Sequence, residues 1–332
     1  MGIKALRKIQ LGRESTAGTA VAATAIWRGL GGVEDQTEVV FPEEDIGVLS
    51  GTDRSYIAKK LAKLAFDAVP ATFEQLPHIL EAGVKTVGTG AADGSGSDKV
   101  YDYTLPISSA NTIKTYTLEG GDDAGAEEVE YAFVEEFTLA GKAGEAWTMA
   151  ANWLGRQSTP ASFTAALSVP TVEEILFGKT LLYIDAVTAA FGTTLKSNTL
   201  IEASLKVKTG WQPVFTGDGN LYFSFVKCTM PEFVLEVTFE HDATAVAEKV
   251  AWRAQTSRAI QLKATGSAVA TPGTTYTYKT MIINIAGKWE KFDVIGEQDG
   301  NDIVKGTLRG RYNATNSKLG NIIVVNELAS VP

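Results

Sequence analysis

The chain has one cysteine and two histidines among its 332 residues, so most familiar catalytic and metal-binding arrangements lack their ligands. Cys228 cannot form a disulfide within the chain, and a cysteine-based metal cluster is not expected. His78 and His241 lie in no HExxH zinc motif, and no GxSxG nucleophile turn occurs. These absences argue against an enzyme, and we expect no catalytic residue, metal site or cofactor.

Long apolar runs are also absent. No stretch approaches the roughly 18 residues that a membrane-spanning helix needs, so we expect no membrane partner. The opening segment, MGIKALRKIQLGRE, carries basic residues without a sustained apolar stretch after them, and we expect no secretory signal. Hydrophobic residues nevertheless make up 45% of the chain, which is enough to bury a core. The single cysteine suits synthesis in a reducing cytoplasm.

Positive charge is scarce in the first half of the chain. Residues 1–170 carry 14 Lys and Arg against 23 Asp and Glu, whereas residues 171–332 carry 16 of each, so the net charge of −9 lies in the first half. Tight nucleic-acid binding needs clustered cations. Such a surface would not grip DNA, although it could face DNA without holding it.

What the sequence does contain is an internal repeat. The stretch EEFTLAGKAGEAWTMAANWLGR, residues 135–156, returns after 155 residues as EKFDVIGEQDGNDIVKGTLRGR, residues 290–311. Each copy has alternating apolar residues, a glycine-containing turn and a final Gly-Arg, which is typical of a β-hairpin. Short strand-like runs, residues 115–119 and 259–263, precede the two copies. Any two hairpins share some of these features, but the common ending and flanks favour a duplicated β-rich unit.

We therefore expect a mainly β protein made of two tandem β-barrel or β-sandwich units. The predicted division is an N-terminal arm at 1–36, a first unit at 37–160, a linker at 161–175 and a second unit at 176–332. One short helix is expected in each unit, at residues 73–82 and 243–255, the second capped by Asp242. Residues 57–66 suit either a helix or a strand, and we favour a strand.

Gly12-Arg13-Glu14 followed by Gly18-Thr19 and small residues resembles the opening of major tail tube proteins from long-tailed, non-contractile (siphovirus-like) bacteriophages. The motif is short, and beyond it the resemblance is one of character: acidic, cysteine-poor and rich in β-structure. It implies tail-tube-type β units that polymerise into stacked rings around a DNA-ejection channel. It also implies a location in the phage tail, assembled in the host cytoplasm, with tape measure and tail terminator proteins as partners.

Two segments are candidates for contacts between stacked rings. The arm contains apolar residues that need a surface in this subunit or a neighbour, and residues 84–98 form a glycine-rich loop whose alternative interpretation is a mobile surface loop. In the resembling family, a long loop reaches the adjacent ring. The candidate ring-stacking residues are Ile9, Leu11, Val21, Gly88, Gly90, Asp93, Gly94 and Gly96.

An acidic run occupies residues 119–136 without a single lysine or arginine. It is either an ordinary solvated face or part of a negative channel wall that keeps passing DNA from adhering. The candidate lumen-facing residues are Glu119, Asp122, Asp123, Glu127, Glu128, Glu130, Glu135 and Glu136.

The expected function is thus that of a structural virion protein, a tail tube subunit through which double-stranded DNA passes without sequence-specific contact. Because one chain carries two units where related tube proteins with one unit form rings of six, we expect three chains per ring. The alternatives are another virion structural protein, such as a capsid or baseplate β-domain, or a carbohydrate-binding or carbohydrate-cleaving β-protein.

Overall fold

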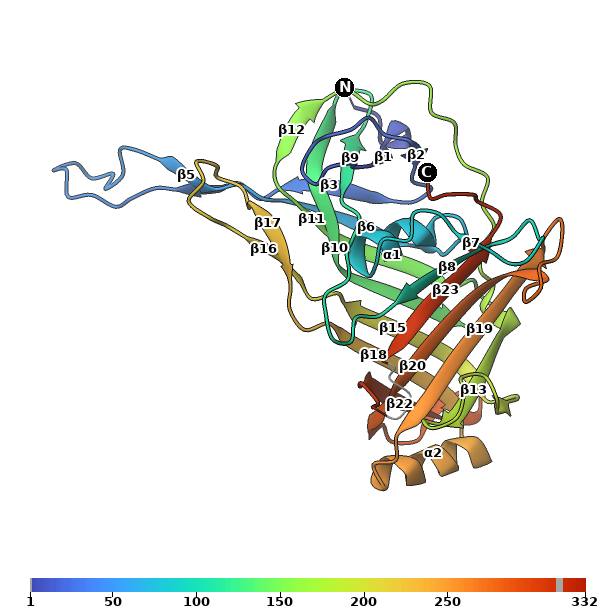
Figure 1. Ribbon diagram of the computed structural model, residues 1–332. Coiled ribbons are helices and arrows are strands. Elements are labelled where there is room, and N and C mark those ends of the chain that lie inside the picture. The colour runs from blue at the N-terminus through green and yellow to red at the C-terminus, as the bar shows by residue number, and fades with distance from the viewer. Residues whose placement is uncertain (1, 315–318) are drawn as a thin grey trace.

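The computed structural model describes residues 2–314 and 319–332; the first residue of the predicted arm and residues 315–318 of the predicted second unit lie outside this description. The protein is mainly β, with 49% of residues in strands and 8% in helices, and most strands join one large antiparallel sheet (Figure 1). No closed barrel is found within the described residues. The expectation of a mainly β chain with two short helices is confirmed.

The first half of the chain supplies two helical segments and twelve strands. They are η1 (Lys4–Leu6), β1 (Lys8–Arg13), β2 (Ala25–Ile26), β3 (Gly31–Asp35), β4 (Glu38–Val40), β5 (Tyr56–Lys59), β6 (Ala62–Pro70), α1 (Leu76–Gly83), β7 (Ala91–Ala92), β8 (Lys99–Thr104), β9 (Tyr116–Gly121), β10 (Ala126–Lys142), β11 (Thr148–Gly155) and β12 (Ser158–Ala161).

The second half begins with a short helical turn and contains α2. Its elements are η2 (Phe177–Lys179), β13 (Thr180–Ala186), β14 (Leu195–Lys196), β15 (Leu200–Lys208), β16 (Trp211–Val214), β17 (Phe225–Cys228), β18 (Glu232–Glu240), α2 (Ala243–Arg253), β19 (Arg258–Ala268), β20 (Tyr278–Phe292), β21 (Gly296–Gln298), β22 (Asn301–Gly310) and β23 (Gly320–Asn326).

Eight strands form a continuous wall in the order β3–β6–β11–β10–β15–β18–β22–β20. The strand β10 belongs to the wall only from residue 133 onward. Its first part pairs with β9 and β12 instead, and the change of partner falls at Tyr131, whose φ of +54° lies in the left-handed region. In the same way the first part of β20 pairs with β19 and β23, and β23 then pairs with β8.

The two hairpins recognised in the sequence have the same strand register. In β10–β11, Val134 pairs with Trp153, and a bulge then separates Val134 from Glu136. In β20–β22, Trp289 pairs with Leu308, and a bulge separates Trp289 from Lys291. Val134 and Trp289, Trp153 and Leu308, and Glu136 and Lys291 are each 155 residues apart in sequence. Because a bulge inserts one residue at a defined point, its recurrence at the equivalent position strongly supports the internal repeat.

The repeat extends beyond the hairpins to the order and pairing of their neighbours. In the first half, β3 pairs with β6, β6 with β11, and α1 follows β6; in the second half, β15 pairs with β18, β18 with β22, and α2 follows β18. Likewise β1 and β13 pair with β9 and β19, directly after η1 and η2. We call these two sets the first and second repeats.

Both helices lie close to where the sequence places them. The predicted 73–82 is observed as α1 at 76–83, with the Thr72 hydroxyl accepting a hydrogen bond from the Gln75 amide at 3.2 Å. The predicted 243–255 is observed as α2 at 243–253, and the Asp242 carboxylate accepts from the Ala245 amide at 2.9 Å, as the capping pattern predicts. Residues 57–66 contain β5 and β6, so the choice of strand is confirmed.

The two repeats share one hydrophobic core. A single cluster of buried side chains runs from Ile9 to Val331, and α1 lies inside it with all eight residues buried. Figure 1 shows α1 in the middle of the molecule and α2 at its lower edge. The two structural repeats are therefore packed together through a common interior, and η1, β1 and β3 of the first repeat lie within the predicted arm at 1–36.

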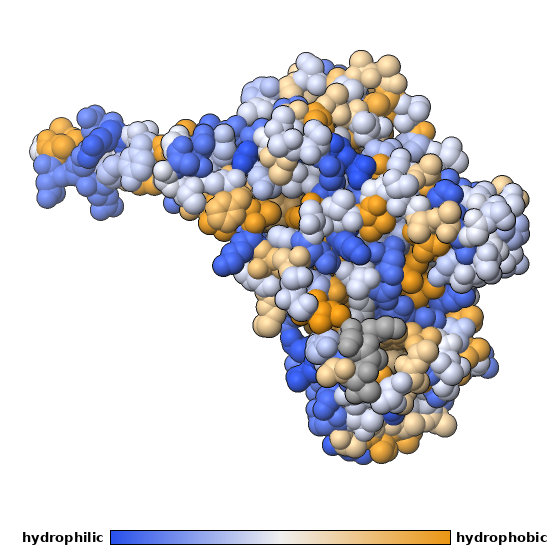
Figure 2. Space-filling model, viewed as in Figure 1, coloured by the Kyte–Doolittle hydropathy of each residue, from blue (hydrophilic) through white to orange (hydrophobic). Residues whose placement is uncertain are grey.

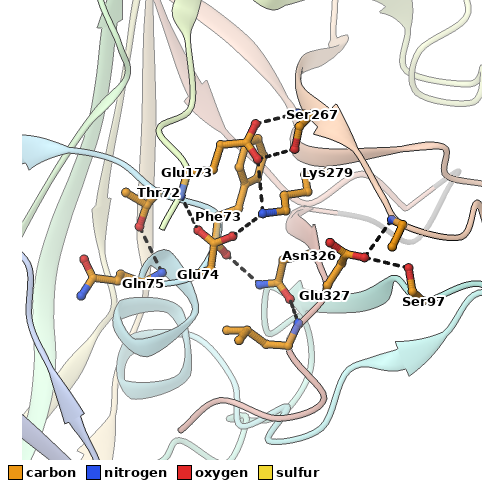
Figure 3. A network of polar contacts seen from close by, with 12 residues as sticks. Thr72, Phe73, Glu74, Gln75, Ser97, Glu173, Ser267, Lys279, Asn326 and Glu327 are labelled. Carbon is orange, nitrogen blue, oxygen red and sulfur yellow. Dashed lines mark hydrogen bonds and ion pairs between the residues drawn. The ribbon is translucent and has the colours of Figure 1, made fainter. Parts of the chain in front are cut away.

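A polar network fastens the predicted linker to both repeats (Figure 3). Glu173 accepts hydrogen bonds from the Ser267 amide and hydroxyl and lies 3.2 Å from the Lys279 ammonium group. That ammonium group also contacts Glu74 at 2.7 Å, and Glu74 accepts from the Glu173 amide at 2.8 Å. Lys279 of β20, whose side chain is only 16% exposed, thus binds one carboxylate from before α1 and one from the linker.

Candidate assembly surfaces

The described residues contain no group of three or more His, Cys, Asp and Glu side chains arranged to hold a metal ion. His78 is fully buried in α1, with its Nδ1 3.2 Å from the Tyr116 hydroxyl. Burial, helped by the nearby positive charge of Arg13, lowers the pKa of His78 to about 3, so its imidazole is neutral at physiological pH. This histidine therefore has a packing role inside the core.

The Gly-Arg-Glu motif of the arm has an internal structural role. Arg13 forms a two-pronged ion pair with the buried Glu81 of α1, at 2.9 and 3.0 Å, and donates to the carbonyl of Val331. Glu14, also buried, accepts from the Gly18 amide, the hydroxyls of Thr115 and Thr117, and the Tyr131 amide at the bend in β10. The motif therefore fixes the arm onto its own chain.

The apolar residues predicted for ring stacking in the arm are already housed in this subunit. Ile9 and Leu11 are buried in β1, which pairs along its whole length with β9, while Val21 is half-buried and contacts the backbone beside Gly12. The surface that these side chains require is thus supplied by the chain itself. A role for the three residues in ring stacking stays a prediction, and the two buried ones would have to act indirectly.

The glycine-rich loop at 84–98 is tied to the long β19–β20 connection. The Asp93 carboxylate accepts from the amides of Thr275 and Tyr276, both at 2.7 Å, and Gly96 lies against Gly273. At its start, the Gly88 amide donates to Glu81. Gly90 and Gly94 lie against Tyr101 and Thr274 respectively. The loop is therefore held within the chain, and whether it also contacts an adjacent ring stays a prediction.

The acidic run does not form one surface. Glu119 is buried and accepts from the amide and hydroxyl of Thr164, at 2.7 and 2.6 Å, so its side chain is withdrawn from any channel. Burial, together with the charges of Glu119 and Glu14, raises the pKa of Glu128. The others are spread over the β9–β10 turn and both parts of β10, and their orientation to a lumen stays a prediction: Asp122, Asp123, Glu127, Glu130, Glu135 and Glu136.

The exposed face of the eight-strand wall has mixed charge. Lys206 of β15 lies 3.1 Å from Glu136 of β10, and Lys142 lies 3.4 Å from Glu202. Further along the wall, Lys305 contacts Glu236 at 2.5 Å. These ion pairs across neighbouring strands make this part of the face hydrophilic and engage three of its lysines with carboxylates.

The junction between the repeats is a strand pair, β10 with β15, in the register Glu136–Lys208 through Lys142–Glu202. It buries Leu139 completely against Leu205, which is 1% exposed. The tip of the β10–β11 hairpin also packs beside η2, where the Phe177 amide donates to the carbonyl of Glu145 at 3.0 Å. The β10–β15 junction therefore consists of two paired strands and a hairpin tip that packs beside η2.

At the two ends of the wall lie the strands that correspond to β10 and β15. Among the described residues, neither of them has a partner strand on its outer side. Val294, which matches Leu139 at an offset of 155, is 88% exposed, and Ile295 beside it is also exposed. At the opposite end of the wall, β3 pairs with β6 on one side only, and Leu30 just before it is 69% exposed. The wall thus has two apolar free edges, which sheet proteins normally cover or protect.

Two hairpins project from one side of the molecule, and Figure 1 shows them side by side. The β4–β5 hairpin links β3 to β6 and the β16–β17 hairpin links β15 to β18, so they are equivalent parts of the two repeats. The longer hairpin carries exposed apolar residues near its tip, among them Val48 and Leu49, visible as an orange patch in Figure 2. The sequence predicts strands on both sides of the turn at residues 47–53, but it does not indicate that these strands project from the body of the molecule.

Comparison with models of known protein families finds no match to this chain, and comparison with curated proteins finds none either. Within the part of the chain that the structure describes, neither helix has the length and apolar character required to traverse a lipid bilayer. The features that bear on function are the internal repeat, the β10–β15 junction and the two free edges of the wall.

Proposed function

We propose that this protein is a structural subunit that assembles into rings of three chains, which stack into a tube resembling the tail tube of non-contractile phages. The observation that carries the proposal is the repeated wall. Two equivalent four-strand segments lie side by side in one sheet and are joined by the β10–β15 pair. Strands equivalent to β10 and β15 lie at the two ends of the sheet, each without a described partner on its outer side. A contact between unlike surfaces, repeated around an axis, generates a closed ring.

Three chains would supply six wall segments, each with a hairpin projecting to the same side. The hydrophilic, ion-paired face of the wall would line the channel, and the buried face with α1 would lie outside it. Double-stranded DNA would pass with little adhesion, since Lys142, Lys206 and Lys305 on this face are each engaged by a neighbouring carboxylate. Chemistry is not part of the proposed mechanism, and no cofactor is required.

Stacking of rings is assigned to the longer β4–β5 hairpin, whose tip would cover its apolar residues against the next ring. In this account the assembled tube is part of a virion, where a tape measure protein would occupy the lumen and a terminator protein the end. The three-chain ring distinguishes this proposal from a capsid or baseplate β-domain, neither of which needs a closed tube.

Electron microscopy of the purified protein under concentrating conditions tests the proposal. We expect hollow tubes or rings with a lumen wide enough for a DNA duplex. Deleting residues 43–53 at the β4–β5 tip should leave single rings but prevent tubes, because the wall edges are unchanged. The matched control deletes residues 217–220 at the tip of the shorter β16–β17 hairpin. A protein that stays monomeric at every concentration would contradict the proposal.

A further inference from the structure

We infer that the wall closes between chains through one specific strand pair: residues 291–297 of one copy with residues 30–36 of a second copy, with Val294 opposite Val33. This inference rests on the proposed function for its setting, but it names the residues and register of the contact. The partner is a second copy of this chain, and the argument follows from the junction already formed inside the chain.

The register follows from two equivalences. Residues of β10 and β20 correspond at an offset of 155, because Val134–Trp153 and Trp289–Leu308 occupy the same place in their hairpins. Strands β3 and β15 correspond at an offset of 172, because Val33 pairs with Leu64 opposite Trp153, and Leu205 pairs with Leu235 opposite Leu308. Transferring the Leu139–Leu205 pair by these offsets gives Val294 opposite Val33.

Side-chain chemistry fits this transfer. Leu139 and Leu205 are buried together, whereas Val294 is largely exposed and Val33 is half-buried at the edge of the core. Placing the two valines opposite each other would remove both from water, as cross-strand pairs do. The free edge at β3 would receive its missing hydrogen-bonding partner in the same step.

The ion pair across the junction recurs with its charges exchanged. Within the chain, Glu136 of β10 pairs with Lys206 of β15. The transferred positions are Lys291 and Glu34, so the carboxylate and the amine have changed sides while the attraction is kept. Lys291 already contacts Asp293 at 3.2 Å, and Asp293 would lie opposite Glu34. Lys291 would therefore bridge two carboxylates that otherwise repel each other.

A socket for the hairpin tip lies beside β3. Within the chain the β10–β11 tip rests against η2, and the corresponding place beside η1 is an open hollow of about 790 Å³. Its lining includes residues 29–33 at the start of β3, and it carries three cations (Lys4, Arg7 and Lys8) and three carboxylates (Asp67, Asp122 and Glu127). The tip that would enter it, between β20 and β22, carries Glu297 and Asp299. The hollow therefore offers space for the tip in the place that η2 marks at the junction inside the chain, with the cations of η1 and β1 within its lining.

Cysteine cross-linking tests the register directly, in a Cys228→Ser background so that the native thiol does not interfere. Chains carrying Val33→Cys are mixed with chains carrying Val294→Cys and oxidised. We expect a disulfide-linked pair of chains from the mixture and linked products limited to three chains from the double variant. The control pairs Val33→Cys with Ile295→Cys, because a shift of one residue turns the side chain to the other face.

The inference is overturned if the Val33–Val294 product does not form, whether or not tubes are seen, or if the shifted control forms it equally well. Cross-linked chains without tubes would support this junction and contradict the proposed function. Tubes without the cross-link would do the reverse. The two claims therefore fail separately.

Charge exchange provides a second test on the same assembly. Lys291→Glu gathers three carboxylates at the junction, and we expect the concentration needed for half-maximal assembly to rise at least about tenfold. Adding Glu34→Lys should recover most of that loss, because an attractive pair is rebuilt. Circular dichroism and gel filtration confirm that each variant remains folded. Loss of assembly without recovery in the double variant would contradict the proposed pairing.

Discussion

Leu139 and Val294 occupy the same place in two hairpins with the same register and bulge, yet one is fully buried and the other 88% exposed. Both are aliphatic, so the difference does not arise from residue type. It arises because β15 follows in the chain and pairs with the outer side of β10, whereas residues 293–297 have β22 on one side and no described strand on the other. The second repeat therefore has an exposed edge at Val294, and the pairing of β10 with β15 shows what kind of strand would cover it.

The largest expected effect separates these two positions in the free chain. Leu139→Ala should lower the free energy of unfolding by about 3 kcal/mol, because it leaves a cavity in a closed junction. Val294→Ala should change it by less than about 0.5 kcal/mol, since its side chain is solvated. Urea unfolding of the two variants at a concentration where the protein is monomeric checks this. Equal destabilisation would show that Val294 is covered within its own chain.

A second comparison concerns the two helices, since α1 is entirely buried whereas α2 buries only three residues. Below its ordinary pKa of 6.5, His78 gains a proton in the unfolded chain but not in the folded one, whose pKa is about 3. The free energy of unfolding should therefore fall by about 1.4 kcal/mol per pH unit between pH 6 and pH 4 from this residue alone.

His78→Phe removes that contribution. As the pH falls through this window, the free energy of unfolding should therefore fall more steeply for the wild type than for the variant. His241→Gln is the matched control, because His241 is half-exposed just before α2. Thermal or urea unfolding at several pH values provides the measurement. A difference that does not change with pH would show that His78 becomes charged inside the fold.

The smallest effect contrasts the two Gly-Arg endings. Arg156 donates to the carbonyls of Phe223 and Ser224, at 3.0 and 2.8 Å, and lies 4.5 Å from the ring centre of Tyr131. Arg311 is exposed. Arg156→Ala should cost about 1 kcal/mol and increase hydrogen exchange in the β16–β17 hairpin, whereas Arg311→Ala should change neither. Unaltered exchange in the Arg156 variant would mean that other contacts hold this hairpin.

Much of the repeat could be predicted from sequence, because the hairpin signals are local. An ungapped offset of 155 aligns glycines, apolar positions and the final Gly-Arg of the two hairpins. Asp242 predicts the start of α2 because it is a favourable N-cap residue. The mainly β class with two short helices followed from the same patterns. The equivalent register of the bulges required the structure, since nothing in Glu135 or Glu290 distinguishes a bulged residue from a paired one.

The misjudged features depend on partners far away in sequence. Glu119 was read as a surface carboxylate, but Thr164 satisfies it inside the protein. Asp93 was read as part of a free loop, but it binds amides about 180 residues later. In the β4–β5 hairpin, the glycines at residues 47–53 indicate a turn between two strands, but they do not indicate how far those strands extend from the body of the molecule.

The most direct test of the central claim is the number of chains in an isolated ring, measured by native mass spectrometry on the variant lacking residues 43–53. The account predicts a closed species with three times the mass of the variant chain, and averaged top views with three-fold symmetry and six similar lobes. A ring of six chains, or an open-ended series of dimers and tetramers, would contradict the equivalence between the junction inside the chain and the junction between chains.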